Sequence, residues 1–378
     1  MDDQRNSVII SCSYNQDSPT SVPPNGQNEN RVSQPDFDSA NSFNKILVIG
    51  LGQLGLPVAK YVKDRGFDVY GYDISTKALE RAEKTAGIKK AINFSGFDVY
   101  IICVSTHRQE DMFSPQIEGI LSIVQDKIAK EAKNGALVSI ESTIPKGTSK
   151  KVFEMLNHRL HVAHAPHRWY ALEEKEHGVN QLRVVGGVCD CCLRAAMQFY
   201  DGAVISTIEE EQQTEASTPK SASIEATEIT TSGNGNGNGN GQGLNNFTNI
   251  PSTKNTSLGI PMHPVPEIEI AELTKIVENA HRYLQIAFAE DLYLYCQANN
   301  INFAELRDSL NTKWNVNVLE PREGIGGHCL PKDTKMFLNS SRSIKSKIIE
   351  AAIQADLEYR RYRENRAGIT PYVDKASS

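Results

Sequence analysis

A glycine-rich turn between an apolar segment and a helical pattern constrains the fold of this chain most. Residues 45–50 form a short β-branched segment, and the turn Gly50-Leu-Gly-Gln-Leu-Gly55 follows directly. A second apolar segment, residues 67–72, leads into Asp73, about 20 residues after the turn. The order of strand, glycine turn, helix, strand and acidic residue is typical of a dinucleotide-binding unit in a doubly wound parallel sheet.

The turn residues suit a bound pyrophosphate. The first glycine allows a tight turn, the second lets the backbone approach the ligand, and the third lets the helix pack closely on the strand. The N–H groups at the start of the helix attract the anion. Asp73 can accept hydrogen bonds from a ribose 2′-hydroxyl and repels a 2′-phosphate, which favours NAD over NADP. We predict cofactor contacts at Gly50, Gly52, Gln53, Leu54, Gly55 and Asp73.

The doubly wound pattern continues through four further buried segments. These are residues 97–104, 136–140, 160–164 and 183–187, with a helical pattern over 117–132. Ligands bind at the carboxyl ends of parallel strands, where polar residues follow two of the segments. We therefore predict further cofactor contacts at Val104, Thr106, Ser142 and Thr143. A Ser or Thr after a strand is also a common helix cap, so that alternative stays open.

Composition limits the other classes of function. The 378 residues have room for two domains, and the net charge of -6 argues against a nucleic-acid-binding protein. No apolar run is long enough to span a bilayer, and no signal sequence precedes the first strand. Seven cysteines form no framework-like pattern, so we expect reduced thiols in a cytoplasm.

Composition also sets the expected boundaries. Residues 1–42 are polar and are predicted to form a disordered tail, and 206–262 form a low-complexity flexible insert with a Gly-Asn repeat. Between them, 43–205 are predicted to form the NAD-binding Rossmann domain. A mainly helical dimerisation domain is expected over 263–365, followed by a tail at 366–378.

The helical domain opens with a long pattern that begins near Pro264. Apolar residues lie nearly all round it, which predicts a buried helix able to pair with a second copy of the chain. Lys275 and Asn279 are four residues apart and share one face. A lysine in an apolar setting is costly unless it is used or paired, although a surface lysine is the plainer interpretation. Shorter helices are predicted at 301–310 and 345–362.

Two cysteine motifs have functional alternatives. Cys329 lies in the glycine-rich segment Gly324–Asp333, where it is either a nucleophile or a buried cysteine in a tight turn. Cys189-Asp-Cys-Cys192 lacks a second ligand pair at zinc-finger spacing, and adjacent cysteines fit poorly on one ion. We interpret the second motif as the start of a helix that runs to Tyr200, and predict no metal site.

Together these motifs resemble the UDP-glucose/GDP-mannose dehydrogenase family of nucleotide-sugar 6-dehydrogenases, and are most similar to the UDP-N-acetylmannosamine type. The resemblance covers roughly 44–205 and 263–365. Besides the glycine turn, four segments carry it: Val104-Ser-Thr106, Glu141–Thr148, Ala271–Asn279 and Gly326–Asp333.

The resemblance implies a chemistry in two oxidation steps. An alcohol at C6 of the sugar becomes a carboxylate, with two NAD+ used, for polysaccharide or glycan synthesis. Cys329 would capture the aldehyde as a thiohemiacetal that is oxidised to a thioester and hydrolysed. Lys275 would assist deprotonation and stabilise the oxyanion, Asn279 would hold the reacting oxygen or water, and Asp333 would orient water or Lys275. Lys332 is expected at the cofactor, and a homodimer is expected through residues 267–298.

Two departures from the family pattern define the alternatives. The family usually continues into a third domain that closes on the substrate, which we expect this chain to lack or a partner to supply. His167, in Pro166-His-Arg168, stands where the family has a glutamate linked to water handling. The competing interpretations are a two-domain β-hydroxyacid-type dehydrogenase using Lys275 and Asn279, and a non-catalytic NAD-binding dimerisation partner. No nucleic acid or membrane partner is expected.

Overall fold

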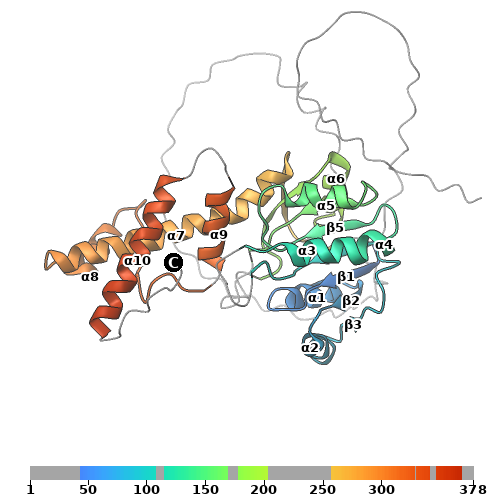
Figure 1. The fold of residues 1–378 in the computed structure, drawn as a ribbon, viewed down its shortest axis with the longest axis horizontal. Coiled ribbons are helices and arrows are strands. Elements are labelled where there is room, and N and C mark those ends of the chain that lie inside the picture. Colours follow the sequence, from blue (N-terminus) through green and yellow to red (C-terminus); the bar gives the residue numbers. More distant parts are fainter. Residues whose placement is uncertain are drawn as a thin grey trace, which may run out of the picture.

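The chain forms a sheet lobe and a helical lobe that share one long helix (Figure 1). The computed structural model describes residues 43–107, 115–168, 178–202, 257–327, 329–340 and 346–367. The predicted tail 1–42, most of the predicted insert 206–262 and residues 368–378 lie outside this part. No helix in the described ranges combines the length and apolarity that a membrane span requires.

The sheet lobe is a Rossmann-type parallel sheet with two added strands. Its strands are β1 (Lys45–Ile49), β2 (Asp68–Tyr72), β3 (Lys89–Lys90), β4 (Val99–Ile102), β5 (Leu137–Ile140), β6 (His161–His164), β7 (Arg183–Gly187) and β8 (Met262–Val265). Their order is β3-β2-β1-β4-β5-β6-β7-β8, and only the β6–β7 pair is antiparallel among the described strands. The predicted doubly wound fold is confirmed.

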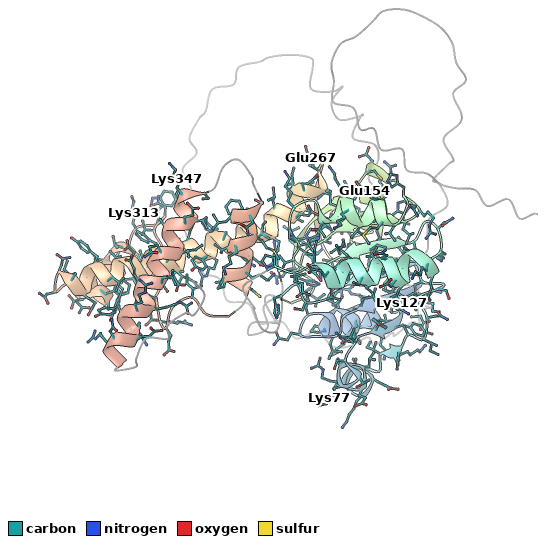
Figure 2. All side chains as sticks on the ribbon, in the orientation of Figure 1. Lys77, Lys127, Glu154, Glu267, Lys313 and Lys347 are labelled. Carbon is teal, nitrogen blue, oxygen red and sulfur yellow. The ribbon has the colours of Figure 1, made fainter. Side chains whose placement is uncertain are left out.

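Helices cover both faces of the sheet because successive strand residues point to opposite sides. On β1, Ile46 and Val48 pack with one core cluster, and Leu47 and Ile49 pack with the other. The helices of this lobe are α1 (Gly55–Asp64), α2 (Thr76–Ala86), α3 (Glu118–Ile123), the π-helical turn η1 (Val124–Ile128), α4 (Ala129–Glu131), α5 (Thr148–Met155) and α6 (Asp190–Tyr200). Figure 2 shows charged side chains such as Lys77, Lys127 and Glu154 on the outside of this lobe.

The helical lobe is built on α7, which starts against the sheet and runs away from it (Figure 1). Its helices are α7 (Ile268–Ala298), α8 (Phe303–Leu310), α9 (Cys329–Asn339) and α10 (Lys347–Ala367). A small core forms where α7 and α10 meet the segment before α9, around Tyr283, Ala287, Ile325 and Ala352. α7 and α9 pack side by side, which brings the predicted Lys275 and Cys329 regions together.

Several elements differ from the sequence expectation: β3, α2 and α5 were not predicted, and α10 extends beyond the predicted end at residue 362. Three further differences affect the domain boundary and the site. β8 was not expected, and it places residues 262–265 in the sheet, although the predicted helical domain began at 263. The predicted helix 117–132 is interrupted by η1. Cys329 was expected in a loop, but it is the first residue of α9, a helix that was not predicted.

Candidate active site

The first turns of α7 are bound to two other segments around Lys275. The buried Glu272 accepts hydrogen bonds from Gly147 N at 2.6 Å and Ser149 N at 2.8 Å, at the start of α5. One turn beyond Lys275, Glu278 forms an ion pair with Arg168. These contacts fix the helix while Lys275 lies between them, on the face toward α9.

Lys275 lies among charged groups in a desolvated position. Burial lowers the pKa of its ammonium, and the negative charges of Asp333, Glu278 and Cys329 oppose the decrease. A lysine with a lowered pKa can exchange protons closer to neutral pH than an exposed one. The position therefore suits the proton transfers that the sequence predicted for Lys275.

Asp333 connects the predicted catalytic and cofactor residues. It is 1% exposed, accepts a hydrogen bond from Asn279 Nδ2, and its Oδ1 lies 2.7 Å from Lys332 Nζ. Lys332 Nζ in turn donates to Thr106 Oγ1 at 3.1 Å. The chain of contacts runs from α7 through α9 to the loop after β4, so it joins the two lobes at the carboxyl edge of the sheet.

Cys329 is exposed at the first turn of α9. Desolvation by neighbouring atoms raises the pKa of its thiol and the charge of Asp333 adds to the rise, whereas the ammonium groups of Lys332 and Lys275 lower it. The net direction is upward. The thiol therefore needs a nearby base to become a thiolate, and Lys275 is close enough to act on it electrostatically.

The glycine turn fits the pyrophosphate of a dinucleotide. A Cβ at Gly50 would lie 2.7 Å from Cys103 O, and one at Gly55 would lie 1.7 Å from Gly50 O. A Cβ at Gly52 would meet nothing within 4 Å, so this backbone is open to a ligand. Gln53 is exposed beside it, and no side chain in the described residues caps α1 at Leu54. In the first turn of α1, Leu56 N donates to Gly52 O at 3.3 Å and Pro57 has no N–H, so an anion there would bind through the open backbone around Gly52 and the positive end of the helix.

Asp73 holds the turn that precedes α1. Its Oδ2 accepts a hydrogen bond from Leu51 N at 2.7 Å, and its Oδ1 accepts one from Ser75 N at 2.8 Å. Each carboxylate oxygen has a further acceptor position, so Asp73 can also bind a ribose hydroxyl. The residue shapes the site as well as being placed to bind the cofactor.

The remaining predicted cofactor residues lie at the ends of β4 and β5. Ser142 donates its hydroxyl to Ile102 O at 3.2 Å and to Val104 O at 2.7 Å, so it ties the two strand ends together. Val104 and Thr143 are partly buried beside it. Ser142 is therefore not a helix cap, since its hydroxyl donates to carbonyls at the end of β4, and α5 begins only at Thr148.

A buried polar cluster surrounds Glu141, behind the site. Glu141 makes a short hydrogen bond with His167 Nε2, accepts a hydrogen bond from the Tyr200 hydroxyl, and lies 3.2 Å from Arg183. Burial alone would raise the pKa of Glu141, but the charges of His167 and Arg183 and the hydrogen bonds lower it to about 2. Burial and the charge of Arg183 lower the pKa of His167 to about 4. At neutral pH the pair is therefore a carboxylate and a neutral imidazole.

Sequence reasoning missed the residues that hold the site in place. Glu272 and Glu278 lay in the Ala271–Asn279 motif, and Arg168 lay in Pro166-His-Arg168, but no contact was predicted for them because their partners are more than 100 residues away. Glu141 lay in a motif that was noted, but its pairing with Arg183 was not apparent from spacing. The available signal was an acidic residue directly after the apolar segment 136–140, because an acid in such a position is buried only when it is paired.

Two family models match this chain. The NAD binding domain of the UDP-glucose/GDP-mannose dehydrogenase family matches residues 80–204, and the central domain of the same family matches residues 269–357. Together the two segments cover more than half of the sequence. The first includes the ends of β4 and β5, and the second includes Lys275, Asn279, Cys329 and Asp333.

Individual proteins and structures agree with these matches. UDP-N-acetyl-D-mannosamine dehydrogenase of Methanococcus maripaludis is 26% identical over 82% of this chain, which spans 64% of that relative's length. The structure of the Pyrococcus horikoshii UDP-D-ManNAc dehydrogenase aligns with a TM-score of 0.61 at 23% identity, over 86% of this chain and 73% of that one.

A 3-hydroxyisobutyrate dehydrogenase of Mycobacterium tuberculosis aligns with a TM-score of 0.53 at 14% identity, over 86% of this chain and 96% of that one. The fold is therefore shared with this hydroxyisobutyrate dehydrogenase, and the fold alone does not separate the two classes of dehydrogenase. The family models and the motifs within them separate the two classes. By these matches, the chain belongs to the UDP-glucose/GDP-mannose dehydrogenase family.

Proposed function

We propose that this chain catalyses the NAD-dependent oxidation of a nucleotide sugar at C6, from alcohol to carboxylate. The observation that carries the proposal is the meeting of Lys275, Asn279 and Asp333 with Cys329 on two packed helices, linked through Lys332 to the cofactor edge of the sheet. A simple hydroxyacid dehydrogenase has no need of the thiol.

The glycine turn, Asp73 and Thr106 would hold the cofactor, the turn at the pyrophosphate and Asp73 at the ribose. NAD+, when bound, accepts the hydride that leaves C6 in each oxidation. With the cofactor bound in this way, the contact between Lys332 and Thr106 would bring α9 beside it. Because Cys329 begins α9, the same contact sets the position of the sulfur.

The chain's own residues perform the acid–base and covalent steps. Neutral Lys275 takes the proton of the C6 hydroxyl, and Asn279 hydrogen-bonds the oxygen. The Cys329 sulfur then bonds to the aldehyde carbon, and the thiol proton passes to the aldehyde oxygen, which gives a thiohemiacetal. In the second oxidation, after Lys275 has released its first proton to solvent, the thiohemiacetal loses a hydride from C6 and its hydroxyl proton to Lys275, which gives the thioester. Water then attacks the thioester carbon and the C–S bond breaks. One water proton returns to the Cys329 sulfur, the other is released, and the product leaves as a carboxylate. Asp333 keeps Asn279 and Lys332 in place throughout.

We further propose UDP-N-acetylmannosamine as the substrate, with the product used in polysaccharide synthesis. The support is that relatives which match most of the chain, from Methanococcus maripaludis and Campylobacter jejuni, are UDP-N-acetyl-D-mannosamine dehydrogenases. The support for the reaction and the support for the substrate are separate. The residues above account for the chemistry at C6, and only the relatives indicate which sugar is oxidised.

The test is an NADH assay with UDP- and GDP-sugars, run beside two variants. Wild type should form two NADH per carboxylate. Cys329→Ala should lower carboxylate formation by at least about 10³-fold, since it removes the nucleophile. Lys275→Met should lower kcat by about 10²- to 10⁴-fold. Cys296→Ala and Lys313→Met, which lie away from the site, serve as matched controls.

Other outcomes would favour the alternatives. One NADH per turnover with no effect of Cys329→Ala would identify a hydroxyacid-type dehydrogenase. NAD binding by calorimetry without turnover of any sugar nucleotide would identify a non-catalytic partner.

We also propose a homodimer through α7. Four exposed apolar side chains follow one stripe of the helix: Ile270, Val277, Phe288 and Tyr295, with 40%, 39%, 57% and 57% of their surface exposed. Their spacings of seven and eleven residues are close to whole helical turns, so the stripe is straight enough to pack on a copy of itself.

The dimer is tested by sedimentation. Phe288→Glu combined with Tyr295→Glu should convert a dimer into a monomer, because each added carboxylate would be buried in the interface. Trp314→Glu changes an exposed aromatic residue elsewhere and should leave the dimer intact. A wild-type chain that sediments as a monomer at every concentration would contradict the proposal.

A further inference from the structure

Three cysteines converge where α6 begins. Cys189 Sγ lies 2.9 Å from Cys191 Sγ and 3.2 Å from Cys192 Sγ. Both distances exceed a disulfide bond of about 2.05 Å. The three sulfurs therefore form a compact set of soft donor atoms within one helical turn.

A histidine from another element completes the set. One ring nitrogen of His161, the first residue of β6, lies within 4.8 Å of the ligand atoms of Cys191 and Cys192. The His161 side chain is 4% exposed, and its Nδ1 has no hydrogen-bond partner among the described residues. Burying an imidazole nitrogen without a partner is costly unless something binds it.

We propose that Cys189, Cys191, Cys192 and His161 bind one thiophilic metal ion, with Zn²⁺ the ion of choice. Three thiolates and one imidazole are a ligand set that Zn²⁺ takes in tetrahedral structural sites. The sequence pattern could not identify His161 as the fourth ligand, because β6 and α6 are about 30 residues apart. The antiparallel pairing of β6 with β7 brings them together.

The geometry allows an ion with small adjustments. A tetrahedral Zn²⁺ with bonds of about 2.3 Å to sulfur needs sulfur atoms about 3.8 Å apart. The Cys189 sulfur would move away from its two neighbours by under about 1 Å and would also approach His161, because only Cys191 and Cys192 already lie within 4.8 Å of the histidine nitrogen. Cys189 and Cys191 are only partly buried, so the ion can reach the site and the side chains can move. The N-terminus of α6 also favours the thiolate form of the ligands.

The position of the site predicts a structural role. β6 starts at His161, and β7 runs antiparallel to it and ends two residues before Cys189. The site therefore lies at the amino edge of the parallel strands, opposite to the carboxyl edge that carries Glu141 and Thr106. A metal here would clip α6 to β6 without touching the reaction.

A second group of possible ligands, Cys103, Glu141 and His167, does not suit an ion in the same way. Its carboxylate already lies 3.2 Å from the Arg183 guanidinium and accepts the Tyr200 hydroxyl. A cation there would face a buried positive charge. This group provides a control for the experiment.

The experiment titrates the reduced, metal-stripped full chain with Zn²⁺ against a chromophoric chelator, and repeats the titration with Co²⁺. Wild type should bind one tight equivalent of Zn²⁺, and Co²⁺ should give the absorption of a tetrahedral thiolate complex. Cys189→Ser and His161→Gln should each weaken Zn²⁺ binding by about 10-fold or more. Cys103→Ser and Cys329→Ser should retain full affinity.

Zinc binding should also raise the melting temperature of wild type and not that of Cys191→Ser, a variant at a partly exposed position that is expected to fold. The proposal is overturned if reduced wild type binds no Zn²⁺, or if Cys189→Ser, Cys191→Ser and His161→Gln all bind it as wild type does. Loss of binding in Cys103→Ser alone would move the site to the other cluster and would also overturn it.

Discussion

Two buried histidines make the sheet lobe sensitive to acid. His164 and His167 are both almost fully enclosed. Burial lowers the pKa of His164 to about 4, and burial with the charge of Arg183 does the same for His167. In the unfolded chain each returns to about 6.5. The unfolded state therefore binds more protons between pH 6.5 and 4, so the free energy of unfolding falls as pH falls through this window.

The variant His164→Leu tests whether His164 contributes to this pH dependence of the free energy of unfolding. Each such histidine contributes a slope of up to about 1.4 kcal/mol per pH unit in the window. The variant should lose the part of the slope that belongs to His164, as measured by urea unfolding at pH 7, 6 and 5. His281→Gln is the control, because His281 is exposed in the folded chain. An unchanged slope in His164→Leu would rule out a buried neutral imidazole.

At the scale of elements, the packing of α7 against α10 leaves one carboxyl group without a donor. Asp356 on α10 accepts hydrogen bonds from Tyr283 at 2.9 Å, from Ile325 N at 3.2 Å and from Arg360 at 3.0 Å. Both carboxyl oxygens of the buried Glu290 have no partner in the described residues. Burial and the charge of Asp356 raise the pKa of Glu290 to about 8.

Glu290→Gln should therefore stabilise the fold at alkaline pH. The folded state holds a proton on Glu290 that the unfolded state releases above about pH 4.5, so this group lowers stability as pH rises from 4.5 toward 8. Glutamine carries no titrating proton, so the variant lacks this pH-dependent decrease in the free energy of unfolding. Urea unfolding at pH 6 and pH 8.5 should show a smaller loss in Glu290→Gln than in wild type, and the exposed Glu305→Gln should behave as wild type.

Sequence patterns predicted the elements whose signal is local. The strand, turn and helix around Gly50 and the length of α7 follow from apolar periodicity and glycine positions. β8 was missed because Met262-His-Pro-Val265 contains a proline, which is tolerated there because β8 is an edge strand. α9 was missed because Gly326 and Gly327 precede it and Pro331 lies in its first turn, where a proline is compatible with a helix.

The site shows the same division. Lys275 and Asn279 on one face could be read from a spacing of four residues. The contacts of Lys332 with Thr106 and of Glu272 with Gly147 join residues more than 100 positions apart, and no local pattern encodes them. The sequence therefore indicated which residues matter, and the fold was needed to show which of them touch.

At the scale of the whole molecule, the contact between Lys332 and Thr106 links the two lobes directly. Lys332 is 4% exposed and Thr106 is 5% exposed, so the contact is shielded from solvent. Removing the Lys332 side chain would break this contact and would also leave the buried Asp333 without its ion-pair partner. The loss of one partner of a buried ion pair lowers the free energy of unfolding by about 3–5 kcal/mol.

Lys332→Met should consequently uncouple the lobes. In wild type, calorimetric unfolding should show one transition that NAD shifts as a unit. In Lys332→Met, the helical lobe should unfold at a lower temperature, and NAD should shift the transition of the sheet lobe alone. Lys335→Met, which changes an exposed lysine on the same helix, should preserve a single transition. A single NAD-shifted transition in Lys332→Met would show that α7 alone couples the lobes.

The length of α7 has a mechanical consequence. Its 31 residues make a rod of about 45 Å, rooted at the sheet, where a Cβ on Gly186 would come within 2.8 Å of Ile268 Cα. A rotation of about 5° at this root would move the far end by about 4 Å. Because the first turns of α7 are bound to the start of α5 and to Arg168, a movement of these segments would turn the whole helix with them. A small rotation at the start of α7 would therefore displace the far end of the helix by a much larger distance.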